Sequence, residues 1–112
     1  MKIGVVGGGN GGCFTALHYA FHTRQTGIEI ELIHNPDVFS EKVGQATVLD
    51  PPQLLFAALG FDWYDNPIHA TMKSGILYEG WGKVNDKLFH PFPADRMAMH
   101  YCPWEMQDYV LN

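Results

Sequence analysis

Cysteine, basic residues and long apolar runs are all scarce in this 112-residue chain. The two cysteines, Cys13 and Cys102, have no second cysteine at metal-ligand or redox spacing, so we expect reduced thiols. Seven Lys and Arg against twelve Asp and Glu give a net charge of −5 without a basic stripe, which argues against nucleic acid as a partner. No stretch has the length and apolarity of a membrane span, and the N-terminus lacks a secretory pattern. We therefore expect a cytoplasmic protein with no membrane contact.

Histidine is more frequent, but its spacing does not indicate a metal site. His18 and His22 form the one pair at helical i, i+4 spacing, without the glutamate that a zincin helix carries between its histidines. Such pairs usually lie on a solvated or half-buried helix face. We therefore expect no metal. The hydrophobic content of 46% is ample for a core and argues against disorder, and the length suits one small domain.

Glycine is concentrated near the N-terminus, where Gly7, Gly9 and Gly12 form a G-x-G-x-x-G turn between an apolar strand over residues 2–6 and a stretch of helical periodicity. The first glycine permits a tight turn, the second lets backbone approach a pyrophosphate, and the third lets the helix pack closely. The helix start then offers free N–H groups to the phosphates. We expect a dinucleotide-binding loop, against the alternative of a purely structural turn, with cofactor contacts from Gly7, Gly9, Asn10, Gly11 and Gly12.

Hydrophobic periodicity predicts strand, helix and strand at the start of the chain. A helix is expected over residues 11–24, with one buried stripe at three-to-four spacing. The residues of that stripe are Phe14, Leu17, Ala20 and Phe21. Residues 28–33 alternate apolar and acidic side chains before continuing apolar, as a strand beside the first would. This order opens a doubly wound sheet.

The pattern is looser after residue 33. We expect a loop over residues 34–50, then a helix that Asp50 caps with its carboxylate and that ends at Gly60. A strand over residues 73–79 is expected to pair with residues 87–89 across a turn at 82–86, as an antiparallel pair. A last helix is expected to begin at Pro103.

Four segments, in order, resemble the N-terminal part of the flavin-dependent tryptophan halogenases. They are Gly-Gln-Ala-Thr at 44–47, Met-Lys-Ser-Gly-Ile at 72–76, Gly-Trp-Gly at 80–82 and Leu-Phe-His-Pro-Phe at 88–92. The resemblance implies an α/β fold, an FAD-binding, Rossmann-like and doubly wound segment with an antiparallel strand pair. We expect residues 1–112 to form one incomplete, truncated halogenase domain that is inactive alone and associates as a homo-oligomer or with a complementing C-terminal chain.

The chemistry that the resemblance implies is FAD-dependent halogenation of an indole or tryptophan-like substrate. Reduced FAD comes from a separate flavin reductase, and oxygen with chloride or bromide as halide co-substrate yields hypohalous acid. Lys73 matches the family lysine that directs the halogen, and His90 and Phe92 match the pair that sandwiches the indole ring. From the residues alone, a strand lysine usually points to solvent, and a surface position for His90 with a core position for Phe89 or Phe92 fits equally well.

The remaining cofactor contacts also come from the resemblance. The family's flavin strap matches Gly44, Gln45, Ala46 and Thr47. Gln45 stands where the family usually has a glutamate, and His34 stands where an acidic side chain normally accepts hydrogen bonds from the ribose hydroxyls. A neutral histidine nitrogen accepts one such bond, and Asn35 or Asp37 could supply another acceptor.

Two other hypotheses stay open at this point. The first is a stand-alone or degenerate FAD- or nucleotide-binding module of the flavin monooxygenase type, without catalysis. The second is a remnant that folds poorly and binds nothing, which the departures at His34 and Gln45 would suit. Saturable FAD binding would favour the binding module over the remnant. Halogenation would favour an enzyme over both.

Overall fold

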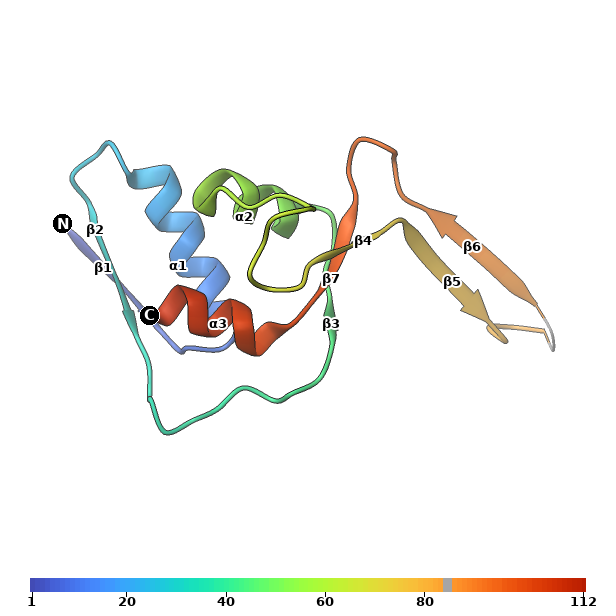
Figure 1. The fold of residues 1–112 in the computed structure, drawn as a ribbon, viewed down its shortest axis with the longest axis horizontal. Helices are drawn as coiled ribbons and strands as arrows, with labels where there is room; N and C mark the ends of the chain where they lie inside the picture. The colour runs from blue at the N-terminus through green and yellow to red at the C-terminus, as the bar shows by residue number, and fades with distance from the viewer. Residues whose placement is uncertain (84–85) are drawn as a thin grey trace.

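The structure, a computed structural model, describes residues 1–83 and 86–112. Three helices lie between a two-stranded parallel sheet and a three-stranded antiparallel sheet, and a hairpin projects away from them (Figure 1). The elements are β1 (Lys2–Val6), α1 (Asn10–Thr23), β2 (Glu29–Ile33), β3 (Gln45–Ala46), α2 (Asp50–Leu59), β4 (Thr71–Lys73), β5 (Gly75–Glu79), β6 (Lys87–Pro91), β7 (Ala98–Tyr101) and α3 (Pro103–Leu111). The α/β fold with a parallel opening unit and antiparallel strands is therefore confirmed.

The first three elements follow the predicted order. Strands β1 and β2 pair in parallel, with Lys2 opposite Glu29 and Val6 opposite Ile33, and α1 connects them. The predicted buried stripe of α1 was wrong at Ala20, which is exposed. Cys13 and Ala16 are the buried residues of α1 instead, because the helix packs against α2 and α3 as well as against β2.

The core gathers where the three helices meet β7. Its fully buried side chains come from α1, α2, the loop before β4, β7 and α3; they include Cys13, Leu55, Ile68, Met99 and Met106. Burial raises the pKa of the Cys13 thiol, so this group stays neutral and packs as a small apolar side chain. Both cysteines are free thiols, as expected.

The second half departs from the predicted strand pattern at Ser74. The expected strand over residues 73–79 is split into β4, which pairs with β7, and β5, which pairs with β6. The Ser74 carbonyl accepts a hydrogen bond of 2.8 Å from the Phe92 N–H, so the chain changes partner there. Strand β3 lies inside the predicted loop over residues 34–50, and β7, at the centre of the order β3-β7-β4, was not predicted.

Both later helices lie where they were expected. Helix α2 ends at Gly60, which has a φ of 70°, a conformation that glycine adopts without steric cost. The predicted cap was wrong: Leu49 is the N-cap residue, and the Asp50 carboxylate, in the first turn, contacts the guanidinium of Arg96 instead.

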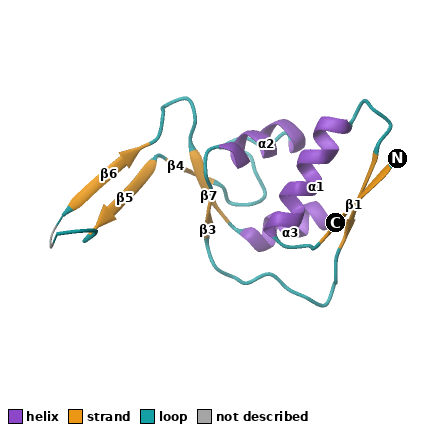
Figure 2. Cartoon of the chain, turned by 180° about the vertical axis from the view of Figure 1, so that it is seen from behind, coloured by secondary structure: helices purple, strands orange, loops and turns teal. Residues whose placement is uncertain are grey.

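The antiparallel pair β5-β6 is confirmed and stands apart from the helices, as the view from behind also shows (Figure 2). Residues 84 and 85 of the predicted turn lie outside the described residues. None of the helices in the described part of the chain combines the length and apolarity needed to cross a membrane.

Candidate functional site

The glycine turn has the geometry that only glycine permits at two positions. Gly7 has a φ of 121°, and its N–H donates a hydrogen bond of 2.8 Å to the carbonyl of Ile33, which anchors the turn to β2. A Cβ at Gly12 would lie 1.7 Å from the Gly7 carbonyl oxygen. The start of α1 therefore packs directly on the backbone of the turn.

The opposite side of the same turn is open. A Cβ built on Gly9 or Gly11 meets nothing within 4 Å. Gly9 is the N-cap residue of α1 without a side-chain capping bond, and the first turn of this helix carries no acidic residue. Its first N–H groups and the positive end of the helix dipole are thus available to an anion. This bare backbone surface fits a dinucleotide pyrophosphate.

A cleft with a volume of about 810 Å³ borders the turn. It lies between the glycine turn, the loop that follows β2, and one face of α3. Five of the predicted cofactor residues line it, namely Gly7, Gly9, Asn10, His34 and Gln45. The others, which are Gly11, Gly12, Gly44, Ala46 and Thr47, lie outside its lining. The structure therefore brings the predicted turn, the end of β2 and Gln45 of the strap to one cleft.

One wall of this cleft was not predicted from the sequence. Trp104, Gln107 and Leu111 of α3 line it, and the Gln107 amide donates a hydrogen bond of 2.8 Å to Oδ1 of Asn10. The helix itself was predictable from Pro103 onward. Its contact with the glycine turn was not predictable, because this contact joins segments almost a chain length apart and no local periodicity encodes it.

Gly8 was not among the predicted site residues. A Cβ at this position would lie 2.8 Å from the Cβ of His34, so the turn and the end of β2 are in close contact. This proximity keeps His34 at the edge of the cleft, which is where a group that binds the ribose would be needed.

Lys73, at the end of β4, does not point freely into solvent. Its side chain is half-buried, and its Nζ donates a hydrogen bond of 3.4 Å to the Thr47 carbonyl. The same Nζ lies 5.6 Å from the centroid of the Phe92 ring, within range of a cation–π interaction. The structure therefore brings together three predicted site residues that are far apart in the sequence.

His90 and Phe92 are neighbours at the base of the hairpin. His90 lies on β6 and is exposed, whereas Phe92 follows the strand and is half-buried. Their ring centroids are 6.0 Å apart, and the ring planes meet at 68°, an edge-to-face arrangement. A flat ring held between parallel faces would require one of the two side chains to rotate.

The strap joins the cleft to the lysine. Gln45 lines the cleft and pairs with Tyr101, and two residues later Thr47 is buried against Met99. The Thr47 N–H donates to the Met99 carbonyl at 2.9 Å, and the Thr47 hydroxyl accepts from the Met99 N–H at 3.1 Å. The strap is thus fixed to β7 by backbone and side chain together.

Replacing Thr47 with valine is expected to lower the free energy of unfolding by about 1–3 kcal/mol, because the buried Met99 N–H loses its acceptor. Urea denaturation followed by circular dichroism measures the change. Thr71→Val is the matched control, since Thr71 is exposed on β4 and its replacement is expected to change stability by less than about 0.5 kcal/mol. Equal effects of the two substitutions would show that the Thr47 hydroxyl does not hold the strap.

Solved structures of two flavin-dependent halogenases and of one tryptophan 6-halogenase share this fold. BrvH from Brevundimonas sp. BAL3 superposes with a TM-score of 0.73 at 18% identity, and Xcc4156 from Xanthomonas campestris with 0.78 at 16%. The tryptophan 6-halogenase SttH from Streptomyces toxytricini superposes with 0.75 at 18%. Each alignment covers 98% of this chain and 32% of the other. The likeness shows a shared fold over about a third of those proteins.

A search of curated protein sequences gives no significant match. The family model of tryptophan halogenases, in contrast, matches residues 2–110, nearly the whole chain. This match confirms the resemblance that the four segments indicated, and the chain accordingly belongs to the tryptophan halogenase family.

Proposed function

We propose that this chain serves an FAD-dependent halogenase that acts on an indole or tryptophan-like substrate. The observation that carries the proposal is the position of the Lys73 ammonium, which contacts the strap at Thr47 and the aromatic face of Phe92. A cation between a cofactor-side segment and an aromatic platform suits the transfer of an electrophile to an electron-rich ring. Family membership and the tryptophan 6-halogenase among the structural relatives support the same substrate class.

The cofactor in this proposal is FAD, reduced by a separate flavin reductase. Its pyrophosphate is held by the backbone of Gly7, Gly9, Asn10, Gly11 and Gly12. The ring nitrogen of His34 accepts from a ribose hydroxyl, and residues 44–47 form the strap beside the flavin. When bound, reduced FAD supplies, with oxygen and a halide, the hypohalous acid that halogenates the substrate.

Lys73 has the directing role. Its ammonium donates a hydrogen bond to hypohalous acid and orients the halogen toward one carbon of the substrate ring. The carbon–halogen bond forms as the oxygen–halogen bond breaks, and the oxygen leaves with the displaced ring proton as water. His90 and Phe92 hold the ring by its faces, so that one edge meets the halogen.

In this proposal, residues 1–112 form one incomplete halogenase domain. Large apolar side chains are exposed at the end of β1 and in the loop that follows β2. Val6 is 82% exposed, Val38 73% and Phe39 87%. Exposed apolar surface of this kind suits contact with a ligand in the cleft, which Val38 and Phe39 line, or with further protein, either a complementing C-terminal region or a second copy.

The proposal is tested first by FAD binding. Titration of the protein into FAD, followed by fluorescence polarisation, is expected to give a saturable signal. Gly9→Val is expected to weaken binding at least about tenfold, because its side chain fills the open backbone surface without meeting protein atoms.

Gly4→Ala is the control for this titration. Gly4 lies on β1, and its Cβ would make an ordinary contact of 3.8 Å with the Ile33 side chain on β2, so FAD binding is expected to be unchanged. A folded sample that gives no saturable response at millimolar FAD would contradict the proposed cofactor site. Equal affinities of the two variants would contradict the role of the turn.

A further inference from the structure

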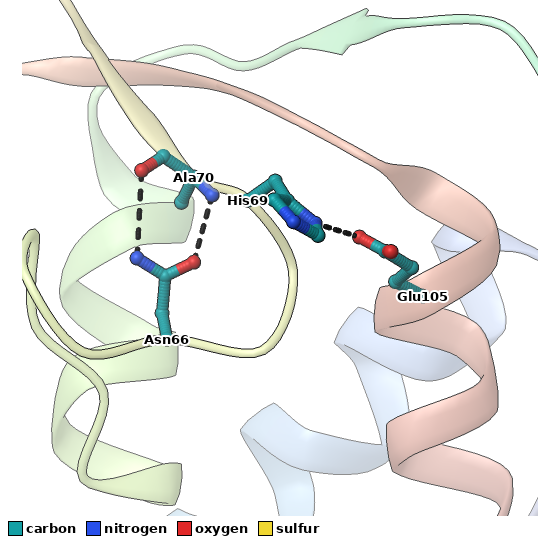
Figure 3. Close-up of polar contacts among 4 residues, drawn as sticks. All are labelled: Asn66, His69, Ala70 and Glu105. Carbon is teal, nitrogen blue, oxygen red and sulfur yellow. Dashed lines mark hydrogen bonds and ion pairs between the residues drawn. The ribbon is translucent and has the colours of Figure 1, made fainter.

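Three potential metal ligands converge outside the cleft. His69 lies in the loop before β4, Cys102 immediately precedes α3, and Glu105 is in the first turn of that helix. One ligand atom from each lies within 4.8 Å of the others. Nδ1 of His69 is 2.6 Å from Oε2 of Glu105 (Figure 3). None of the three lines the nucleotide cleft, so they form a separate cluster, which we call the His69 cluster.

The loop holds His69 in a defined position. The Asn66 side chain makes two hydrogen bonds to the backbone of Ala70: it accepts one of 2.7 Å from the N–H and donates one of 3.4 Å to the carbonyl (Figure 3). On the other side, the Ile68 side chain is buried, and the backbone carbonyl of Ile68 accepts a hydrogen bond of 2.9 Å from the Cys102 N–H. The backbone that carries His69 is therefore fixed on both sides and tied directly to the start of α3.

His69 itself has a strained backbone, with a φ of 51°. A positive φ is uncommon for a residue other than glycine, and such strain concentrates at functional sites. The contact with Glu105 is a weak reason for it, because the His69 side chain is 76% exposed and surface ion pairs contribute little to stability. A stronger interaction at the same position would account for the strained conformation.

The donor chemistry of the cluster indicates which interaction that is. Imidazole nitrogen, thiolate sulfur and carboxylate oxygen are the three ligand types that zinc takes in proteins. Cys102 is the N-cap residue of α3 and Glu105 is the third residue of its first turn, two positions whose side chains face each other at a helix start.

We propose that His69, Cys102 and Glu105 bind a divalent cation of the zinc class. Binding replaces the thiol proton of Cys102, which goes to solvent, and separates the His69 and Glu105 atoms by placing the cation between them. Three protein ligands leave a fourth position for water. The cation then links the loop before β4 to the first turn of α3, whose other face lines the nucleotide cleft through Trp104 and Gln107.

The test is a titration of the full chain with Co²⁺, followed by absorption spectroscopy. We expect one equivalent to bind and to produce a thiolate-to-cobalt charge-transfer band, which Zn²⁺ then abolishes by displacing the cobalt. Saturating Zn²⁺ is expected to raise the Tm by several degrees, since the cation binds the folded state alone. Absence of the charge-transfer band from the folded protein would overturn the proposal.

Variants assign the ligands. Cys102→Ser is expected to lose the band, and His69→Gln and Glu105→Gln are each expected to weaken Co²⁺ binding at least about tenfold. The control is the double variant His18→Asn, His22→Asn, because that exposed pair, with ring centroids 4.4 Å apart on α1, offers imidazoles without a thiolate. It is expected to keep the band.

Far-ultraviolet circular dichroism must be the same for all variants, so that a lost band reports a lost ligand. A band that persists in the folded Cys102→Ser variant, or that disappears in the folded double histidine variant, would also overturn the assignment. Each readout is independent of FAD and of halogenation, so failure here leaves the proposed enzyme function untouched.

Discussion

Replacing Gly12 with alanine is expected to abolish saturable FAD binding and to lower the free energy of unfolding by at least about 3 kcal/mol. The added Cβ would lie 1.7 Å from the carbonyl oxygen of Gly7 and 2.7 Å from its carbonyl carbon. Both are backbone atoms, so no side-chain rotation relieves the clash. Either α1 moves away from β1 or the Gly7 peptide turns, and each change disrupts the bare backbone surface beside Gly9.

The control for this substitution lies on the same helical turn. A Cβ at Gly11 meets nothing within 4 Å, and alanine favours helix over glycine by about 0.5–1 kcal/mol. Gly11→Ala is therefore expected to be as stable as the parent protein or slightly more so. Urea denaturation of both variants, with FAD titration of Gly12→Ala, makes the measurement. A Gly12→Ala variant that retains parental stability and FAD affinity would contradict the close packing described for the turn.

Replacing Lys73 with methionine is expected to reduce halogenation at least about 100-fold while FAD affinity changes less than about twofold. Methionine fills a similar volume but lacks the ammonium that contacts Thr47 and faces the Phe92 ring. The measurement is the rate of halogenated product in the full-length protein supplied with a flavin reductase. The rate of FAD reoxidation, recorded in the same assay, is expected to stay near its parental value, because the lysine acts on hypohalous acid.

Lys87→Met serves as the matched control. Lys87 is an exposed strand lysine on β6 that pairs with Glu79 at 2.8 Å, and its loss is expected to leave halogenation unchanged. Unchanged halogenation in Lys73→Met would remove Lys73 from the mechanism. A parallel loss of FAD affinity and halogenation would instead assign Lys73 a role in holding the strap.

The local part of the fold was predictable because local signals encode it. The glycine turn, the two helices that begin near residues 50 and 103, and the parallel pair β1-β2 all follow from spacing, prolines and alternation. Strand β3 has two residues and β7 has four, so neither is long enough for a period to emerge. Their pairing depends on contacts such as Thr47 with Met99, far apart in the chain.

In the candidate site too, local signals were predictable and contacts between distant segments were not. Its residue types were predictable from the turn and from the family segments, and five of them meet at the cleft. The contact of Lys73 with Thr47 was not predictable, because a continuous strand over residues 73–79 would have placed Lys73 in the hairpin. The break at Ser74 assigns it to the sheet of β7 instead, where it reaches the strap.

The strap has a mechanical consequence, because three consecutive residues, 45–47, connect the cleft with the lysine. Gln45 forms part of the cleft wall, and the carbonyl of Thr47 is the acceptor for the Lys73 ammonium. A ligand that shifts Gln45 also moves this acceptor, because Ala46 alone lies between Gln45 and Thr47. Occupancy of the cleft and alignment of the lysine are therefore expected to be linked reciprocally, within the twofold limit on FAD affinity that Lys73→Met tests.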